Sequence, residues 1–273
     1  VLFRSKKFSD KLINGPISKK YFLKKKFIGI TEYLANKTNS KNILIDQYAL
    51  EGSFKNDEFI NLYYEGLKLT QMEDTDNFYK QCRSYTLQQM LTQVLDSGLE
   101  GNVAECGCWK GHSSYIIATI LKRYNFNQIF SIFDSFEGGL SSKDFQDTNS
   151  RKDLNESELK KEKLSFSSLE SDLHKVLNPF KFYTLFKGWI PERFNEVSEQ
   201  EFIFVHLDVD LYQPTQDGLE FFYPRLKKNG VIIVDDYGYS QFPGAKKSVD
   251  EFLMKNDYSI FLKLLTGGCL IVK

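Results

Sequence analysis

Short apolar segments alternate with longer amphipathic segments from residue 101 onward. The apolar segments are six or seven residues long and hold mostly strand-forming residues, which is typical of strands inside a sheet. We predict strands at 102–107, 129–134, 182–188, 202–208 and 230–236. The segments between them predict helices at 112–124, 153–177, 215–226 and 245–255. This alternation predicts a doubly wound α/β domain with a mainly parallel sheet.

The two ends of the chain depart from this alternation. Residues 259–273 predict two further strands joined by a Gly-Gly pair, a hairpin at the sheet edge. Residues 43–97 have helical spacing and stop before Gly98, a residue typical of helix C-termini. Residues 1–42 contain 11 Lys or Arg against two acidic residues. We therefore expect a basic arm and a helical extension ahead of the main domain.

Composition adds few constraints. Acidic and basic residues are equal in number, 36 of each, so charge gives no reason to expect a nucleic-acid partner. No apolar run approaches the roughly 18 to 20 residues of a membrane span, and the first residues do not resemble a signal peptide. The four cysteines lack zinc-type spacing and are too sparse for a disulfide framework, so we expect a cytoplasmic protein.

Four of the predicted strands carry acidic residues at their carboxyl ends. Glu105 lies in the first strand and Asp134 ends the second. Asp208 ends the fourth strand, and the pair Asp235 and Asp236 ends the fifth. Ligands of open α/β sheets bind beyond these strand ends, and clustered like charges are unfavourable unless a cation, ligand or water neutralises them. The acids therefore predict a ligand site at this edge.

The first strand leads into a glycine-containing turn, "ECGCWKGHSS". Gly107 and Gly111 allow a tight turn and close approach to a ligand before a helix begins. Trp109 stands where the dinucleotide fingerprint has its middle glycine, so the turn is not that fingerprint. Asp134 ends the next strand, where an acid can accept hydrogen bonds from ribose hydroxyls. The combination predicts a nucleoside-bearing ligand.

A second group of acids consists of Asp208, Asp235 and Asp236. Three carboxylates on neighbouring strands suit a hard divalent cation, most simply Mg²⁺, which could hold a substrate hydroxyl and lower its pKa. Asp210 falls in the loop after Asp208 if the strand ends there. It is either a partner of these ligands or a cap of the helix near Thr215.

Several of these segments together resemble a known family. The motifs are "VAECGCWKGHSS", "IFDSFEGG", "FKGWIPERF", "HLDVDLYQPTQDGLEFFYPRLKKNGVIIVDDYG" and "GAKKSVDEF". Their order over residues 85–273 resembles that of the macrocin O-methyltransferase (TylF-like) family. The resemblance implies a Rossmann-like fold of class I S-adenosylmethionine (SAM) methyltransferases, with a seven-stranded sheet whose last strand is antiparallel. It also implies Mg²⁺-dependent methyl transfer to a sugar hydroxyl.

The resemblance also assigns roles to individual residues. It places Glu105 and Gly107 in the first SAM-binding motif and Asp134 at the ribose. Gly111, Ser113, Ser135 and Trp189 are further expected SAM contacts, and Trp189 either stacks on the adenine or packs in the fold. Residues expected to bind the metal are Asp208, Asp235 and Asp236. The same three positions resemble the metal acids of catechol O-methyltransferase, but Leu211 stands where that family has its catalytic Lys. The resemblance therefore implies Asp208 as the base, with His206 as the alternative.

The expected organisation is a basic arm and helical extension at 1–84 followed by a methyltransferase domain at 85–273. The extension is expected to act as a lid or as an oligomer contact, such as that of a homodimer. The acceptor is expected to be a surface glycan or a glycosylated natural product. Two other functions stay open: a non-catalytic SAM-binding or scaffold protein, and an NAD-dependent oxidoreductase. The oxidoreductase has no use for the pair Asp235 and Asp236.

Overall fold

A computed structural model of the chain describes residues 57–142, 145–147 and 156–273. The chain divides into two compact units, Val1–Asp57 and Glu58–Lys273, and the second contains every described residue except Asp57. The predicted basic arm at 1–42 lies outside the described residues. The division expected between residues 84 and 85 stays a prediction.

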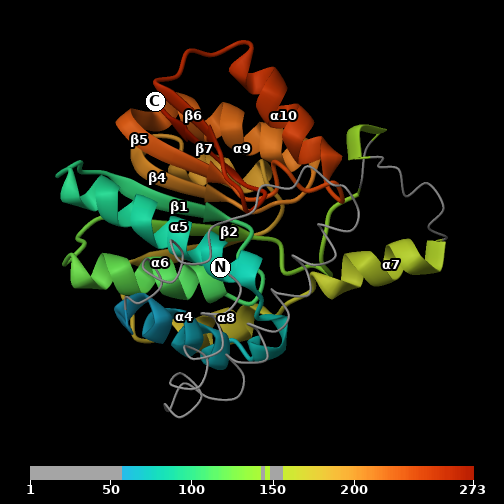
Figure 1. Cartoon of the computed structure of the whole chain (residues 1–273), viewed down its shortest axis with the longest axis horizontal. Coiled ribbons are helices and arrows are strands. Elements are labelled where there is room, and N and C mark those ends of the chain that lie inside the picture. Colours follow the sequence, from blue (N-terminus) through green and yellow to red (C-terminus); the bar gives the residue numbers. More distant parts are fainter. Residues whose placement is uncertain (1–56, 143–144, 148–155) are drawn as a thin grey trace, which may run out of the picture. The chain divides into compact units, whose positions relative to one another are not determined.

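One mixed sheet of seven strands forms the centre of the described chain (Figure 1). Its order is β3-β2-β1-β4-β5-β7-β6, in which β1 to β5 are mutually parallel and β7 is antiparallel to both β5 and β6. The strands are β1 (Asn102–Cys106), β2 (Phe130–Asp134), β3 (Tyr183–Lys187), β4 (Phe202–Leu207), β5 (Leu226–Val234), β6 (Ile260–Lys263) and β7 (Cys269–Val272). The predicted fold is confirmed, including the C-terminal hairpin at the sheet edge, in which β6 is the edge strand and β7 lies between β5 and β6.

Helices cover both faces of the sheet (Figure 1). On one side lie α4 (Asp57–Leu69), α5 (Phe78–Asp96), α6 (His112–Arg123) and α8 (Glu170–Leu177). On the other lie α9 (Tyr212–Arg225) and α10 (Pro243–Leu253), while α7 (Glu156–Ser165) extends away from the sheet. Short 3-10 turns complete the set: η1 (Glu73–Thr75), η2 (Phe145–Asp147) and η3 (Glu192–Val197). No helix in these described segments is long and apolar enough to cross a membrane.

Two predicted helices differ from those observed. The charged stretch predicted as one helix contains two, α7 and α8. Helix α9 begins at Tyr212, three positions before the predicted start at residue 215. Pro214 then falls in the first turn, where the missing N–H removes no hydrogen bond, so the helix tolerates it.

Aromatic side chains fill much of the core between the sheet and α9. The ring of Phe133 stacks on Phe186 with centroids 4.8 Å apart and meets Phe194 edge-on at 5.3 Å. Phe222 of α9 packs against Phe202 of β4 at 5.0 Å. Strand β4 is buried along its whole length, which agrees with its continuous apolar sequence.

The strand order places the predicted site at one edge. Because β1, β2, β4 and β5 are parallel, their carboxyl ends meet at the same edge, and the direction of winding reverses between β1 and β4. Gly107 has φ 81°, and a Cβ there would lie 1.9 Å from the carbonyl oxygen of Asp208. The turn after β1 therefore packs directly on the end of β4, and this contact requires glycine.

Candidate active site

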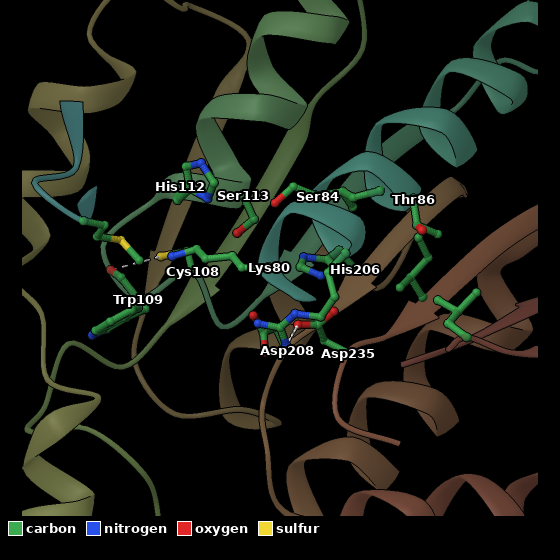
Figure 2. A pocket seen from close by; sticks show the side chains of 15 residues that line it. Lys80, Ser84, Thr86, Cys108, Trp109, His112, Ser113, His206, Asp208 and Asp235 are labelled. Atoms are coloured by element: carbon green, nitrogen blue, oxygen red, sulfur yellow. Dashed lines mark hydrogen bonds and ion pairs between the residues drawn. The ribbon is translucent and has the colours of Figure 1, made fainter. Parts of the chain in front are cut away.

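Three side chains converge just past the ends of β4 and β5. His206, Asp208 and Asp235 each offer a ligand-type atom, and these atoms lie within 4.8 Å of one another (Figure 2). Strand β4 ends at Leu207, so Asp208 is the first residue beyond it. The Asp208 N–H donates to the Cys106 carbonyl at 2.9 Å, and the Asp235 N–H donates to that of Leu207 at 2.9 Å. Backbone hydrogen bonds between neighbouring strands thus fix the backbone positions from which both carboxylates project.

Burial and mutual repulsion shape the charges of these acids. Burial, together with the charge of Asp235, raises the pKa of Asp208 to about 6, although His206 and Arg83 oppose the rise. The pKa of Asp236 is raised well above its usual value by burial and by the charges of Asp210 and Asp208. Among the described residues, the buried Oδ2 of Asp236 has no hydrogen-bond partner. The site therefore favours additional positive charge.

Arg83 of α5 supplies part of that charge. Its guanidinium forms an ion pair with Asp235 and lies 5.6 Å from the centroid of the Tyr239 ring. The charge of Asp235 raises the pKa of Arg83 above its usual value. The sequence-based predictions missed this residue, since helical spacing in α5 does not show which strand end the helix will meet.

Glu105 points into the protein rather than into the cavity. Its carboxylate is fully buried, and its Oε1 lies 3.0 Å from Nδ1 of His206, the residue opposite it in β4. The Ser114 hydroxyl donates to its other oxygen. Burial alone would lower the pKa of His206, but the hydrogen bond and charge of Glu105 raise it to about 9. His206 therefore keeps its proton at neutral pH, which suits a cation better than a general base.

Asp134 organises the glycine-containing turn. Its Oδ2 accepts hydrogen bonds from the N–H groups of Cys108 at 2.9 Å and Trp109 at 3.0 Å, and its Oδ1 accepts one from Phe136 at 3.1 Å. Gly111 occupies the N-cap position of α6 with φ 86°. The turn is thus held in place by the acid that ends the next strand.

Ser113 and Ser135 lie on different parts of this edge. Ser113, near the start of α6, lines the cavity drawn in Figure 2. Ser135 follows Asp134, and its hydroxyl accepts the N–H of Glu137 at 3.3 Å. The Trp189 indole N–H donates to the Glu137 carboxylate at 2.9 Å. Ser135 and Trp189 therefore lie beside β2 and β3, outside that cavity.

The cavity is closed on one side by residues of α5 and α6. Lys80 lines it, and burial lowers the pKa of Lys80 to about 8. His112 also lines it, and its Nε2 lies 3.1 Å from the Tyr63 carbonyl oxygen of α4. Burial, together with the charge of Lys80, lowers the pKa of His112 to about 4. His112 is thus a neutral donor that ties α6 to α4.

Asp210 does not occupy the helix-capping position that was one of its two predicted roles. The N-cap of α9 is Leu211, and the N–H of Tyr212 donates to Asp147 Oδ1 at 2.7 Å. Asp210 is buried with a left-handed φ of 60°, and its charge acts on Asp236. The other prediction, that Asp210 is a partner of the acid cluster formed by Asp208, Asp235 and Asp236, agrees with that position.

Known proteins match this chain over most of its length. A model of the macrocin-O-methyltransferase (TylF) family matches residues 77–264. Demethyldecarbamoylnovobiocin O-methyltransferase of Streptomyces niveus is 24% identical over 64% of this chain and 66% of its own length. The 8-demethyl-8-(2,3-dimethoxy-alpha-L-rhamnosyl)-tetracenomycin-C 4'-O-methyltransferase of Streptomyces olivaceus is 28% identical over 55% and 58%. Mycinamicin III 3''-O-methyltransferase of Micromonospora griseorubida is 27% identical over 62% and 67%. The chain thus spans 58% to 67% of these relatives' lengths.

Two solved structures share the fold. The O-methyltransferase NovP superposes with a TM-score of 0.56 at 21% identity, over 70% of this chain and 79% of that one. The calicheamicin methyltransferase CalS11 superposes with a TM-score of 0.58 at 17% identity, over 85% and 95%.

Proposed function

Because the chain belongs to the macrocin-O-methyltransferase (TylF) family, we propose that it transfers a methyl group from SAM to a hydroxyl of a sugar-containing acceptor, with Mg²⁺ bound at the acid cluster. The observation that carries this proposal is the convergence of His206, Asp208 and Asp235 at the cavity beside the glycine-containing turn. A sugar acceptor is supported by the name of one relative, which contains a rhamnosyl group. The acceptor is a glycosylated natural product or a surface glycan.

The cofactor would lie over the carboxyl ends of β1 and β2. When bound, SAM supplies a methyl group activated by its positively charged sulfur. The turn that contains Glu105, Gly107 and Gly111 would place its backbone beside the cofactor, because glycine at 107 and 111 permits the positive φ values that this turn requires. The residues that would contact it are Ser113 at the start of α6, Asp134 and Ser135 at the ribose, and Trp189 at the adenine.

The acid cluster fits a hard divalent cation. Asp208 and Asp235 line the cavity and would hold Mg²⁺, with Asp236, which lies outside the converging group of His206, Asp208 and Asp235, as the third proposed ligand. The ion takes oxygen ligands and would supply a Lewis acid that lowers the pKa of an alcohol. The fit rests on a buried carboxylate oxygen of Asp236 without a partner among the described residues and on the raised pKa values of Asp208 and Asp236. Positive charge added at this position would offset the repulsion among the carboxylates of Asp208, Asp235 and Asp236.

Asp208 would accept the proton of the acceptor hydroxyl. With a pKa of about 6 it is ionised at neutral pH and still basic enough to take a proton. His206 already carries a proton in its hydrogen bond with Glu105. The geometry therefore supports Asp208 as the base, and the positive charge of His206 favours the ionised form of the Asp208 carboxylate.

The function can be tested with purified protein, SAM and a panel of acceptors. The panel would include nucleotide sugars, glycosylated macrolides and polysaccharide fragments, with S-adenosylhomocysteine (SAH) and the methylated product detected by mass spectrometry. We expect turnover on at least one sugar class, lost after treatment with EDTA and restored by Mg²⁺. Turnover that is insensitive to EDTA would remove the metal from the proposal. Binding of SAH without turnover on any acceptor would favour a non-catalytic SAM-binding protein.

A further inference from the structure

Lys80 is a charged residue of the cavity to which the proposed function assigns no role. It lies in the first turn of α5, where its ammonium donates a hydrogen bond to the Thr75 hydroxyl at 2.7 Å. No carboxylate of the described residues lies within 4.0 Å of that ammonium. Burial disfavours this ammonium more than the charges of Asp208 and Asp74 favour it, so its position at the cavity favours an anionic ligand.

The surroundings of Lys80 indicate where that anion would come from. Figure 2 shows its side chain among Cys108 of the glycine-containing turn, Ser113 of α6 and Asp208. In the sheet, β1 lies between β2, which ends at Asp134, and β4, which leads to Asp208. A ligand with its ribose at Asp134 and its reactive group near Asp208 must therefore cross the end of β1, beside Lys80.

Two other basic side chains near Lys80 already interact with protein groups. Arg83, one turn further along α5, is paired with Asp235. Lys110 places its ammonium 5.1 Å from the centroid of the Trp109 ring. Among the described residues that line the cavity, Lys80 and Arg83 are the lysine and arginine side chains, and Lys80 is the one that forms no ion pair.

We infer that Lys80 binds the α-carboxylate of the methionine portion of SAM. This inference rests on the proposed function, since it requires SAM in the cavity. It names a ligand contact from α5, outside the glycine-containing turn and outside the acids at the strand ends. It also gives α5 a role in holding the cofactor's charged end above β1.

The test compares two ligands that differ in the amino-acid portion. SAH carries the carboxylate, whereas 5′-methylthioadenosine keeps the nucleoside and lacks it. Calorimetry should show that Lys80→Met weakens SAH binding by about 10- to 100-fold, the range for a lost hydrogen bond to a charged group. Binding of methylthioadenosine should be unchanged. Lys80→Arg should keep most of the SAH affinity, because it keeps the charge.

Controls separate the possible outcomes. Lys68→Met removes an exposed cation from α4 and should leave both affinities unchanged. Equal weakening of both ligands by Lys80→Met would overturn the inference in favour of a structural role. Unchanged SAH affinity with a raised KM for the acceptor would overturn it in favour of an anionic group on the acceptor. If the unaltered protein binds no SAH, the proposed function itself fails; if it binds SAH and Lys80→Met matches it, only this inference fails.

Discussion

Two groups of acids lie at the same edge of the sheet and differ in how well the protein satisfies them. At the ends of β1 and β2, Glu105 accepts from Ser114 and bonds His206, and Asp134 accepts three backbone N–H groups. At the ends of β4 and β5, Asp235 is paired with Arg83, but the Asp208 carboxylate has no hydrogen-bond or ion-pair partner among the described residues, and Asp236 has a buried oxygen without one. The first group is saturated, meaning that each carboxylate oxygen has a protein donor, and the second group is not.

The difference separates acids that hold the fold from acids that await a ligand. A carboxylate whose oxygens are all occupied by protein donors stabilises its surroundings. A buried carboxylate without partners destabilises the fold and needs a functional explanation. On this view, substitution of Glu105 or Asp134 should lower stability, in addition to any loss of the ribose contact proposed for Asp134, and substitution of Asp208 should mainly lower activity.

The largest expected effect is on turnover, from Asp208→Asn. The variant loses the base and one metal-binding carboxylate, so we expect kcat to fall by about 10³-fold or more. The affinity for SAH, measured by calorimetry, should stay within a few fold of the original. Asp172→Asn, on the exposed surface of α8, is the matched control and should leave kcat unchanged. A near-normal rate for Asp208→Asn would contradict both roles of Asp208.

The next effect concerns the Glu105–His206 pair and the pH dependence of stability. The pKa of His206 is about 9 in the folded protein and about 6.5 in an unfolded chain. The folded state binds this proton more tightly, so the stabilisation is complete below about pH 6.5 and is lost as the pH rises through about 9. This difference between the two pKa values corresponds to about 3 kcal/mol of stabilisation of the folded protein. Glu105→Gln should abolish this pH-dependent stabilisation.

Urea unfolding in the presence of EDTA at several pH values between about 6.5 and 9 measures this dependence. Ser114→Ala removes the other partner of Glu105 and should retain the slope, which makes it the control. If Glu105→Gln kept the slope of the unaltered protein, the proton would reside elsewhere than on His206.

Most of the fold, but only part of the candidate site, could be predicted from the sequence. The predicted positions of the parallel strands lie close to the observed ones, although β5 begins at Leu226, four residues before its predicted start. Strands β1, β2 and β4 are almost entirely buried, and such strands have continuous apolar sequences bounded by turns. Asp208 and Asp235 could be placed at strand ends for the same reason. Periodicity within one segment says nothing about the neighbours of that segment, and this limit explains what was missed.

Arg83 and Lys80 illustrate that limit. Both lie on a helix with ordinary spacing, and their approach to the cavity depends on how α5 packs against the sheet. The bond from Glu105 to His206 depends on β1 pairing with β4 in one register, which follows from the strand order rather than from either strand. Tertiary packing therefore decided which acids are saturated.

A smaller effect on stability is expected from Asp134→Asn. The amide keeps one acceptor oxygen but loses the charge, and its NH₂ group must face the N–H of Phe136 or those of Cys108 and Trp109. We expect a loss of about 2 kcal/mol in the free energy of unfolding. Hydrogen exchange should speed up in the turn around Gly107. Ser135→Ala, which removes a single 3.3 Å hydrogen bond nearby, should cost less. Unchanged exchange in the turn would show that Asp134 does not hold it.

The smallest effect has the opposite sign and comes from Asp236→Asn. Since the folded protein resists the ionisation that the unfolded chain undergoes near its usual pKa of 3.8, Asp236 destabilises the fold increasingly as the pH rises. The variant should gain about 1 kcal/mol in EDTA, a rise of roughly 2 to 4 °C in Tm. It should bind Mg²⁺ more weakly in calorimetry. Asp250→Asn, whose carboxylate already accepts from Tyr237 and pairs with Lys246, should bring no such gain. A lower Tm for Asp236→Asn in EDTA would place Asp236 with the saturated acids, and the division between the two groups would fail.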